Sequence, residues 1–347
     1  DYILGGRQLN PWVAAMSAQA SDMSGWLLLG LPGTAYVLYA GTTEAIWTAI
    51  GLAVGTYLNW LIVAKRLRKY TVIAGDSITL PDFFQNRFKD NSGVIKFISS
   101  IFILIFFLFY TASMFSAGAK LFQTVFKVDY LVALIIGVVL IVSYTFLGGF
   151  LAVCWTDMIQ GVLMFCALII TPIIAFNNLG GVSGIQELMN AVPDKFSFLP
   201  YSGGKLNVML LVSSLAWGIG YFGQPHILPR FMAIRSSKEI RPARVIATIW
   251  VVITLSMAVV IGMLGSFLLP NLADSESVFM LMVDKLFPPV LTGILLTAIL
   301  AAIMSTADSQ LLVTSSAVSS DIYGGMLHKN ASSKQVLNVS RITVIVV

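Results

Sequence analysis

Charged side chains are scarce in this sequence. Asp, Glu, Lys and Arg make up 11% of its 347 residues, whereas hydrophobic residues make up 57%. A soluble domain averages about 25% charged residues, because it needs them to cover its surface. The low charged fraction therefore excludes an ordinary water-soluble protein and predicts that lipid surrounds most of the chain.

Cysteine and histidine are also scarce, with two residues of each. Cys154 and Cys166 lie in or beside one apolar stretch without metal-ligand spacing, so we interpret them as packing residues. His226 and His328 form no paired catalytic set, and His226, which follows a proline, is interpreted as a packing or gating residue. We therefore expect neither an enzyme nor a transition-metal site.

Long apolar runs predict a series of membrane spans. They lie at 11–40, 43–64, 94–124, 130–147, 155–177, 206–229, 245–269 and 287–321, and a ninth begins near 341. The segment Thr79-Leu80-Pro81-Asp82 predicts the start of a short amphipathic helix on the membrane surface. Because the last apolar run stops abruptly, we expect the chain to be a fragment that is truncated at both ends.

Lys and Arg residues are distributed unevenly between alternate loops. If residues 1–10 are cytoplasmic, 16 of the 21 cationic residues lie on the cytoplasmic side of the membrane. The other five lie on the opposite side, namely Lys120, Lys127, Lys195, Lys205 and Lys285. An excess of Lys and Arg marks the cytoplasmic side of a membrane protein. The bias predicts the orientation and explains the net charge of +5 without a nucleic-acid partner.

The first and sixth spans are interrupted at membrane depth. The first contains A-S-D-M-S-G at 20–25 and G-L-P-G at 30–33, and the sixth contains W-G-I-G-Y-F-G-Q-P at 217–225. Unpaired backbone in lipid is costly unless it faces protein, water or a ligand. One break alone is compatible with a proline kink or a packing notch, but corresponding breaks in two halves are typical of a transporter binding site. Asp22 adds an ionisable group at mid-span, which marks a functional site.

The eighth span carries hydroxyl and carboxyl groups on one helix face. Ser305, Asp308 and Ser309 are spaced i, i+3 and i+4. A helical hydroxyl lies near the carbonyl three or four residues earlier, so Ser305 and Thr306 can share a cation with the carbonyl of Ala302. Hydroxyl and carbonyl oxygens without nitrogen or sulfur ligands suit a hard monovalent ion.

Asp157, which follows Cys154-Trp155-Thr156, has two interpretations. It can cap the start of the fifth span, where a carboxylate is stabilised by the helix dipole, or it can join Asp308 in a second cation path. From the residues alone we favour the cap. Separately, Gly51 and Gly55 have the G-x-x-x-G spacing that is typical of close packing between membrane helices.

Five stretches carry a more specific signal. They are D-Y-I-L-G-G-R, A-S-D-M-S-G-W, F-L-G-G-F-L-A-V-C-W-T-D, G-Y-F-G-Q-P-H-I-L-P-R-F-M-A and I-L-A-A-I-M-S-T. Together and in this order they resemble the sodium/solute symporter family, and within it the bacterial sodium/proline symporters. The resemblance implies an all-α integral membrane fold of five-plus-five inverted repeats with discontinuous first and sixth core helices. The chain would form one transporter domain, 1–347, with a first repeat at about 11–177 and an incomplete second repeat at about 206–347.

The resemblance also implies residues for each ligand. Sodium would be held by the carbonyls of Ala20, Met23 and Ala302 and the hydroxyls of Ser305 and Thr306, with Asp22 contributing to sodium affinity. The substrate would be bound by Ser24, which also couples sodium to substrate, and by Trp26, Tyr110, Trp217, Tyr221, Gln224 and Pro225. Arg7 would lie on the inner, gating side with Asp157, and a second cation path would use Asp157, Asp308 and Ser309.

The activity implied by the resemblance is sodium-coupled uptake of a small amino acid, L-proline, by alternating access. The protein would be a multi-pass protein of the bacterial cytoplasmic (inner) membrane, with sodium as coupling ion and no cofactor. Its partners would be sodium, the substrate and the lipid bilayer, and no nucleic acid. The alternatives are a symporter of the same family for pantothenate, another carboxylate or a sugar, a cation channel, and a substrate sensor.

Overall fold

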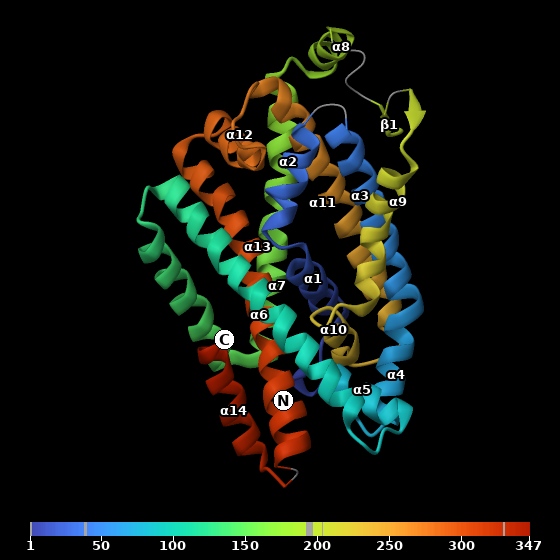
Figure 1. The fold of residues 1–347 in the computed structure, drawn as a ribbon. Coiled ribbons are helices and arrows are strands. Elements are labelled where there is room, and N and C mark those ends of the chain that lie inside the picture. The colour runs from blue at the N-terminus through green and yellow to red at the C-terminus, as the bar shows by residue number, and fades with distance from the viewer. Residues whose placement is uncertain (1, 38–39, 192–196, 203, 329) are drawn as a thin grey trace.

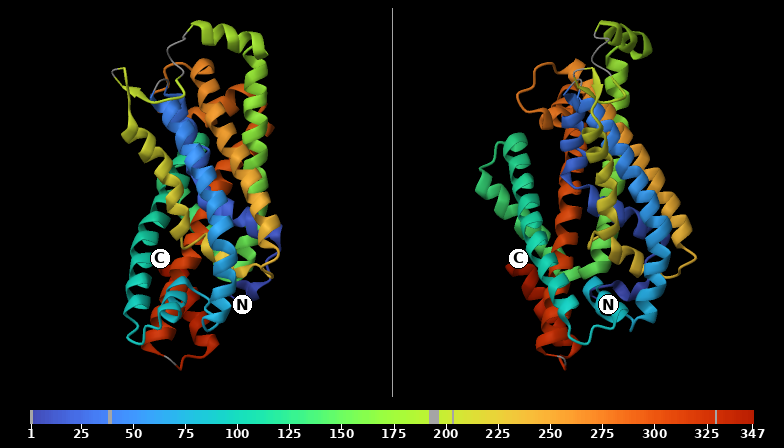
Figure 2. Two further views of the ribbon diagram at one scale, coloured as in Figure 1. Left: turned by 90° about the vertical axis from the view of Figure 1, so that its right-hand side faces the viewer. Right: turned by 45° about the vertical axis from the view of Figure 1, so that its right-hand side comes forward.

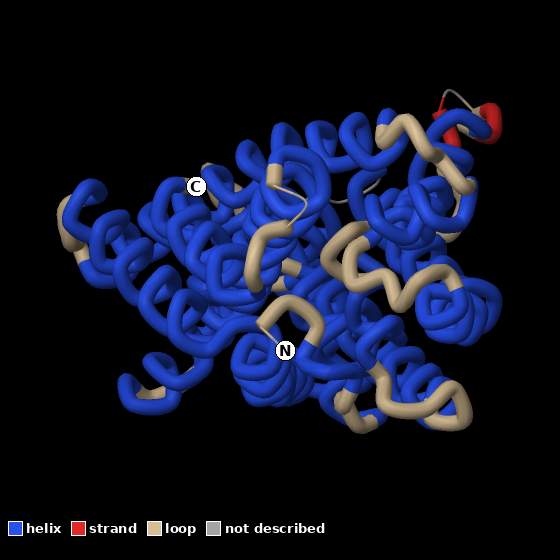
Figure 3. The backbone as a smooth tube through the Cα atoms, turned by 90° about the horizontal axis from the view of Figure 1, so that it is seen from below, coloured by secondary structure: helices blue, strands red, loops and turns tan. Residues whose placement is uncertain are grey.

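The computed structural model describes residues 2–37, 40–191, 197–202, 204–328 and 330–347. Its long helices run roughly along one axis of an elongated molecule (Figures 1 and 2). The two short antiparallel strands, β1 (Tyr201–Ser202) and β2 (Lys205–Leu206), lie at the periphery when the molecule is viewed along that axis (Figure 3). The all-α fold expected from the apolar runs is therefore confirmed.

The first half of the chain contains the following helices: η1 (Gly5–Arg7), α1 (Pro11–Met23), η2 (Gly25–Leu27), α2 (Gly30–Tyr36), α3 (Ala40–Leu58), η3 (Asn59–Ala64), α4 (Lys65–Ile73), α5 (Leu80–Phe88), α6 (Val94–Phe126), α7 (Tyr130–Asn178) and α8 (Gly181–Ala191). The second half contains α9 (Val208–Ala216), η5 (Trp217–Gly223), α10 (Leu228–Ala233), α11 (Ile240–Leu268), η6 (Ser275–Ser277), α12 (Val278–Leu286), α13 (Pro289–Ser316), η7 (Ala317–Leu327) and α14 (Ser333–Val346). In the part of the chain that the structure describes, five stretches are long and apolar enough to cross a membrane: Gly41–Ile73, Val94–Gln123, Tyr130–Asn178, Ile240–Leu268 and Pro289–Leu327.

The helix α7 accounts for two of the predicted spans. Its 49 residues would measure about 74 Å as one straight helix, more than twice the roughly 30 Å thickness of a bilayer core. The helix breaks at Gly149, whose φ of 59° and ψ of −158° are not helical. A Cβ atom there would lie 2.6 Å from the ring of Tyr2, so only glycine fits. The predicted spans at 130–147 and 155–177 are thus joined by one kinked residue instead of a loop.

The helix α3 packs directly against the interrupted sixth span. A Cβ atom on Gly51 would lie 2.7 Å from the carbonyl oxygen of Leu215, and one on Gly55 would lie 2.3 Å from that of Gly218. These distances are shorter than any van der Waals contact, so both positions require glycine. The close packing predicted from the G-x-x-x-G spacing is confirmed.

The cation-rich segments gather at one end of the molecule. The helices α4, α5 and α14 lie at the lower end in Figure 1, and α8, α12 and β1 lie at the upper end. The short helix predicted to start at residues 79–82 is confirmed as α5, whose cap residue Thr79 accepts a hydrogen bond from the Asp82 backbone amide at 3.2 Å. The helices α8 and α12 were not predicted, because they are too short to resemble membrane spans.

Candidate functional site

The first span is interrupted where the sequence predicts a break. The helix α1 ends at Met23, and Ser24 adopts φ 50° and ψ −172°, a conformation that is rare for a residue other than glycine. The Ser24 hydroxyl accepts a hydrogen bond from the Trp26 amide at 3.2 Å and so caps η2. The last four carbonyls of an α-helix lack partners within the helix, so the break leaves oxygens such as that of Ala20 free for other contacts.

The sixth span is interrupted at the predicted place as well. The helix α9 gives way to the 3₁₀ helix η5, Gln224 is extended with ψ 113°, and α10 begins at Leu228. The Tyr221 carbonyl accepts a hydrogen bond from the side-chain nitrogen Nδ2 of Asn59 at 2.7 Å. The carbonyl therefore finds its partner outside its own helix, as the change of backbone geometry requires.

The two interruptions meet in the middle of the molecule. The indole rings of Trp26 and Trp217 stack with centroids 5.2 Å apart, and the Tyr221 hydroxyl lies 3.9 Å from the sulfur of Met23. Both contacts join the first span to the sixth. The juxtaposition expected of an inverted-repeat transporter is present.

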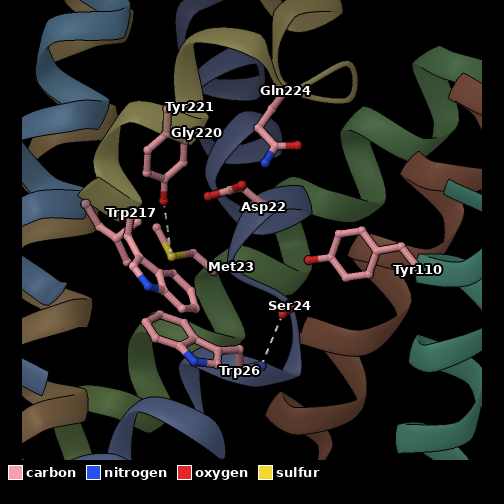
Figure 4. Close-up of a pocket in the computed structure, with 10 residues that line it drawn as sticks. Asp22, Met23, Ser24, Trp26, Tyr110, Trp217, Gly220, Tyr221 and Gln224 are labelled. Carbon is pink, nitrogen blue, oxygen red and sulfur yellow. Dashed lines mark hydrogen bonds between the residues drawn. The ribbon is translucent and has the colours of Figure 1, made fainter. Parts of the chain in front are cut away.

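A cavity of about 140 Å³ lies between the two breaks (Figure 4). Its lining residues are Asp22, Met23, Ser24, Trp26, Leu52, Tyr110, Trp217, Gly220, Tyr221 and Gln224. The stacked indoles form one side, and Tyr110 approaches from the opposite side. The cavity is smaller than the roughly 300–1,000 Å³ of pockets for drug-sized ligands, so it suits a small solute.

Most of the residues expected to bind the substrate line this cavity, and Pro225 is the exception. Pro225 lines a different cavity of about 30 Å³ together with Arg230, and the two cavities share no lining residue. Leu52 of α3 is an additional lining residue that the sequence did not indicate, because an apolar side chain within an apolar span carries no signal of its own.

Oxygen atoms from α1 and α13 converge beside the cavity. The Ser305 hydroxyl donates to the carbonyl of Ala20 at 2.8 Å and lies 3.2 Å from that of Ala302, and the Thr306 hydroxyl donates to Ala302 at 3.0 Å. All four residues are fully buried. Two carbonyl and two hydroxyl oxygens from two helices thus form a compact group of hard ligands, which is the donor set that a monovalent cation prefers.

The Asp22 side chain lies on the cavity side of this oxygen group. Its Oδ1 is 3.4 Å from Nε2 of His226, whose ring is buried and packs 5.6 Å from the ring of Phe107. The His226 ring thus packs inside the protein and places a ring nitrogen against the mid-span carboxylate. The aspartate and the histidine come from the two interrupted spans, so this contact is a further link between them.

A buried ion pair joins α10 to α7. Arg230 of α10 donates to Asp157 at 3.1 Å, to the Ser17 hydroxyl at 3.0 Å and to the Ser309 hydroxyl at 2.5 Å. Ser17 also donates to the Asp157 carboxylate at 2.6 Å. Arg230 is 1% exposed and Asp157 is 0% exposed, so the charges are stabilised by each other and not by water.

The structure contradicts the interpretation of Asp157 as a helix cap. The residue lies inside α7, about two turns beyond the kink at Gly149, where the helix has no free amide groups to cap. Its carboxylate instead holds Arg230, which the sequence suggested only as a cytoplasmic charge. A cation one turn after Pro225-His226, within an apolar segment, was the signal that could have identified it.

The residues of the expected second cation path are also close together. The Tyr144 hydroxyl donates to the Asp308 carboxylate at 2.7 Å, and the Ser309 hydroxyl donates to the same carboxylate at 3.3 Å. Ser309 in turn accepts from Arg230, which connects Asp308 to Asp157. The guanidinium group stands between these two carboxylates.

Arg7 lies at the cation-rich end and ties three segments together. Its guanidinium group donates to the Asp76 carboxylate at 3.0 Å, to the Met232 carbonyl at 2.9 Å and to the Ser77 carbonyl at 2.9 Å. These contacts join the N-terminal segment to α10 and to the loop between α4 and α5. The gating role on the inner side that the resemblance implies for Arg7 stays a prediction.

Comparison with known structures identifies the fold. A Na+-coupled sialic acid symporter in a substrate-bound outward-open state aligns with a TM-score of 0.82 at 23% identity over 100% of this chain and 74% of its own. The nucleobase-cation-symport-1 family transporter Mhp1, closed around bromovinylhydantoin, aligns with a TM-score of 0.62 at 12% identity over 99% of this chain and 72% of its own. Both likenesses support the five-plus-five inverted-repeat fold.

Sequence comparison gives closer relatives. The High-affinity proline transporter PutP of Bacillus subtilis is 46% identical over 100% of this chain and 73% of its own length, and the Osmoregulated proline transporter OpuE of the same species is 44% identical over 100% and 70%. The Sodium/proline symporter of Haemophilus influenzae is 47% identical over 100% and 70%. The model of the sodium:solute symporter family matches residues 2–347. On the strength of this match and of these relatives, the chain belongs to the sodium:solute symporter family.

Proposed function

We propose that this chain is a secondary active transporter that couples the inward movement of sodium to the uptake of proline in the bacterial cytoplasmic membrane. The observation that most directly supports this proposal is the contact between the Ser305 hydroxyl and the Ala20 carbonyl at 2.8 Å, which joins the interrupted first span to α13 beside a small cavity. The relatives named above, at 44–47% identity, are named for proline or for sodium and proline, which favours proline over pantothenate or a sugar. Transport without chemical conversion of the substrate is the proposed activity.

The proposed sodium site uses the oxygens of Ala20, Ala302, Ser305 and Thr306. The hydroxyl hydrogens that now point at carbonyl oxygens can rotate away, so that hydroxyl and carbonyl lone pairs face a cation together. A cation held there would connect α1 to α13. Binding from outside would therefore stabilise the arrangement of the two interrupted spans that forms the cavity.

The proposed substrate site is the adjacent cavity. The rings of Trp26, Trp217 and Tyr221 provide apolar surface for a pyrrolidine ring, and the Tyr110 hydroxyl and the Gln224 amide provide polar groups for the charged end. Aromatic faces attract a cationic ammonium group as well as apolar carbon, so they suit a cyclic amino acid. Sodium completes the site because it holds the end of α1, which supplies Asp22 and Ser24 to the cavity wall.

The sodium gradient supplies sufficient energy for this function. One positive charge that moves through about 100 mV releases about 2.3 kcal/mol, and a tenfold sodium gradient adds about 1.4 kcal/mol. Together these support several-hundred-fold accumulation with one sodium ion per substrate. Alternating access then requires the contacts of Arg230 with α1, α7 and α13 to open on the inner side.

The test is uptake of radiolabelled proline by the purified transporter in proteoliposomes, with and without an inward sodium gradient. We expect saturable uptake that depends on sodium and is competed by unlabelled proline but not by pantothenate or glucose. Uptake that is equal with and without the gradient would refute sodium coupling. Non-saturable sodium flux without substrate would instead indicate a channel.

A further inference from the structure

Two cavities that share part of their lining lie between the interrupted sixth span and the cation-rich end of the molecule. The cavity of about 30 Å³ has Pro225 and Arg230 in its wall, and it also contains Thr79 and Asp321. A larger cavity of about 620 Å³ shares Thr79 and Asp321 and extends to Arg7 at the N-terminal segment. Thr79 and Asp321 therefore lie where the two cavities adjoin, on the inner side of the Arg230 ion pair.

Asp321 is a buried carboxylate with one free oxygen. It lies in η7 and is 1% exposed. Its Oδ1 accepts a hydrogen bond from the Thr79 hydroxyl at 2.5 Å and lies 3.8 Å from the Lys96 ammonium, whereas its Oδ2 has no hydrogen-bond partner among the described residues. A buried carboxylate oxygen without a partner is costly, so its presence at the wall of two cavities points to a ligand.

The charges around the larger cavity favour a cation as that ligand. The ionisable Asp, Lys and Arg side chains lining it are Arg7, Asp76, Asp82, Lys96 and Asp321, so three carboxylates face two cations. Arg7 pairs with Asp76, and Lys96 pairs with Asp82 at 2.9 Å. Lys96 also lies 3.8 Å from Asp321, so one ammonium group is shared between two carboxyl groups, and the acidic side chains of the wall outnumber the cationic ones by one. The Asp321 carboxyl group is buried, whereas Asp76 is mostly exposed to water, with 71% of its side chain accessible.

We propose that Asp321 and Thr79 form a monovalent-cation site on the inner exit route. This inference rests on the transport function proposed above. The ligands would be Oδ2 of Asp321 and the hydroxyl oxygen of Thr79, both oxygen donors that suit a hard cation. Two cations use this route during transport, the sodium ion and the ammonium group of the amino acid, and the same carboxylate chemistry suits either. Such a site lowers the electrostatic cost of moving a cation past Arg230 and holds it before release.

The test compares the two faces of the membrane. Right-side-out vesicles present the outer face to added sodium, and inside-out vesicles present the cytoplasmic face. For Asp321→Asn we expect the sodium concentration for half-maximal proline transport to rise about tenfold at the cytoplasmic face and to change by less than twofold at the outer face. No change at the cytoplasmic face, or equal changes at both faces, would overturn the proposal.

Three variants serve as controls and alternatives. Asp76→Asn removes the same charge from the wall of the same cavity at an exposed position, and we expect less than a twofold change at the cytoplasmic face. A shift as large as that of Asp321→Asn would mean general charge attraction and would overturn the site. Thr79→Val removes the hydroxyl ligand and should give about a threefold shift, whereas Thr79→Ser keeps it and should give none. This pair decides the question if Asp321→Asn does not reach the membrane, because equal behaviour of the two Thr79 variants overturns the proposal.

A second arm distinguishes the two sources of the cation. At saturating sodium, the proline concentration for half-maximal transport is measured at the cytoplasmic face. A shift in the proline value for Asp321→Asn assigns the site to the ammonium group, and a shift in the sodium value alone assigns it to sodium. If neither the proline value nor the sodium value shifts, the proposal is overturned. Wild-type uptake by right-side-out vesicles tests the transport function separately, so a failure there is distinguished from a failure of this site.

Discussion

The contact between Ser305 and Ala20 leads to a quantitative prediction. Ser305→Ala removes one of four oxygens that converge from α1 and α13, at 2.8 Å from the Ala20 carbonyl and 3.2 Å from the Ala302 carbonyl. An interaction with a charged partner contributes about 1.5–3 kcal/mol, and 1.4 kcal/mol corresponds to a tenfold change in affinity. We therefore expect the sodium concentration for half-maximal proline uptake to rise about 10- to 150-fold.

The same helix offers a matched control for this measurement. Ser315 is also buried in α13, and its hydroxyl is hydrogen-bonded to that of Ser340 at 2.7 Å, away from the interrupted spans. Ser315→Ala removes the same atom from the same helix, and we expect less than a threefold change. Uptake is measured in proteoliposomes over a sodium titration at fixed proline. If Ser305→Ala leaves the sodium titration unchanged, the convergent oxygens are not the sodium site.

Other substitutions test the remaining parts of the site. Arg230→Gln leaves the carboxylate of Asp157 buried without its ion-pair partner, which costs about 3–5 kcal/mol. Thermal unfolding in detergent should therefore show a large loss of stability. An unchanged unfolding midpoint would contradict the pairing. Gly55→Ala places a methyl group 2.3 Å from a backbone carbonyl of η5 and should lower the free energy of unfolding by about 1–3 kcal/mol. The control is Gly137→Ala, which should be nearly neutral because a Cβ atom there has nothing within 4 Å. Similar effects of the two substitutions would argue against tight packing. Trp217→Ala removes apolar surface from the cavity wall, and each substrate methylene group that loses its contact costs about 0.8 kcal/mol, a roughly fourfold change. The proline KM should therefore rise about 4- to 15-fold with little change in the sodium titration. The reverse pattern would separate this ring from the substrate.

The sequence predicts the interrupted spans well, because their cause is local. Glycine and proline at membrane depth alter the backbone wherever they occur, so the breaks near Ser24 and Gln224 could be predicted before any contact was known. The contact between the Ser305 hydroxyl and the Ala302 carbonyl was predicted for a similar reason, since helical spacing alone brings the two groups together. That the hydroxyl also reaches Ala20 depends on how α1 and α13 pack.

The sequence predicts partners across the molecule poorly. Arg230 and Asp157 are 73 residues apart, and each has a plausible local role, one as a topology signal and the other as a helix cap. Only the packed structure places one against the other. The join at Gly149 was missed for a related reason, because its φ of 59° depends on Tyr2 lying against it, and nothing near Gly149 in the sequence indicates that contact.

The glycine contacts between α3 and η5 have a consequence for how the transporter moves. At Gly51 and Gly55 the backbones touch without side chains between them, so there is no flexible layer that can deform while one helix slides along the other. The second and sixth spans must therefore travel as one rigid piece. The displacement that alternates access then has to occur elsewhere, at the polar seam where α10 meets α7 and α13, whose hydrogen bonds can exchange partners with entering water.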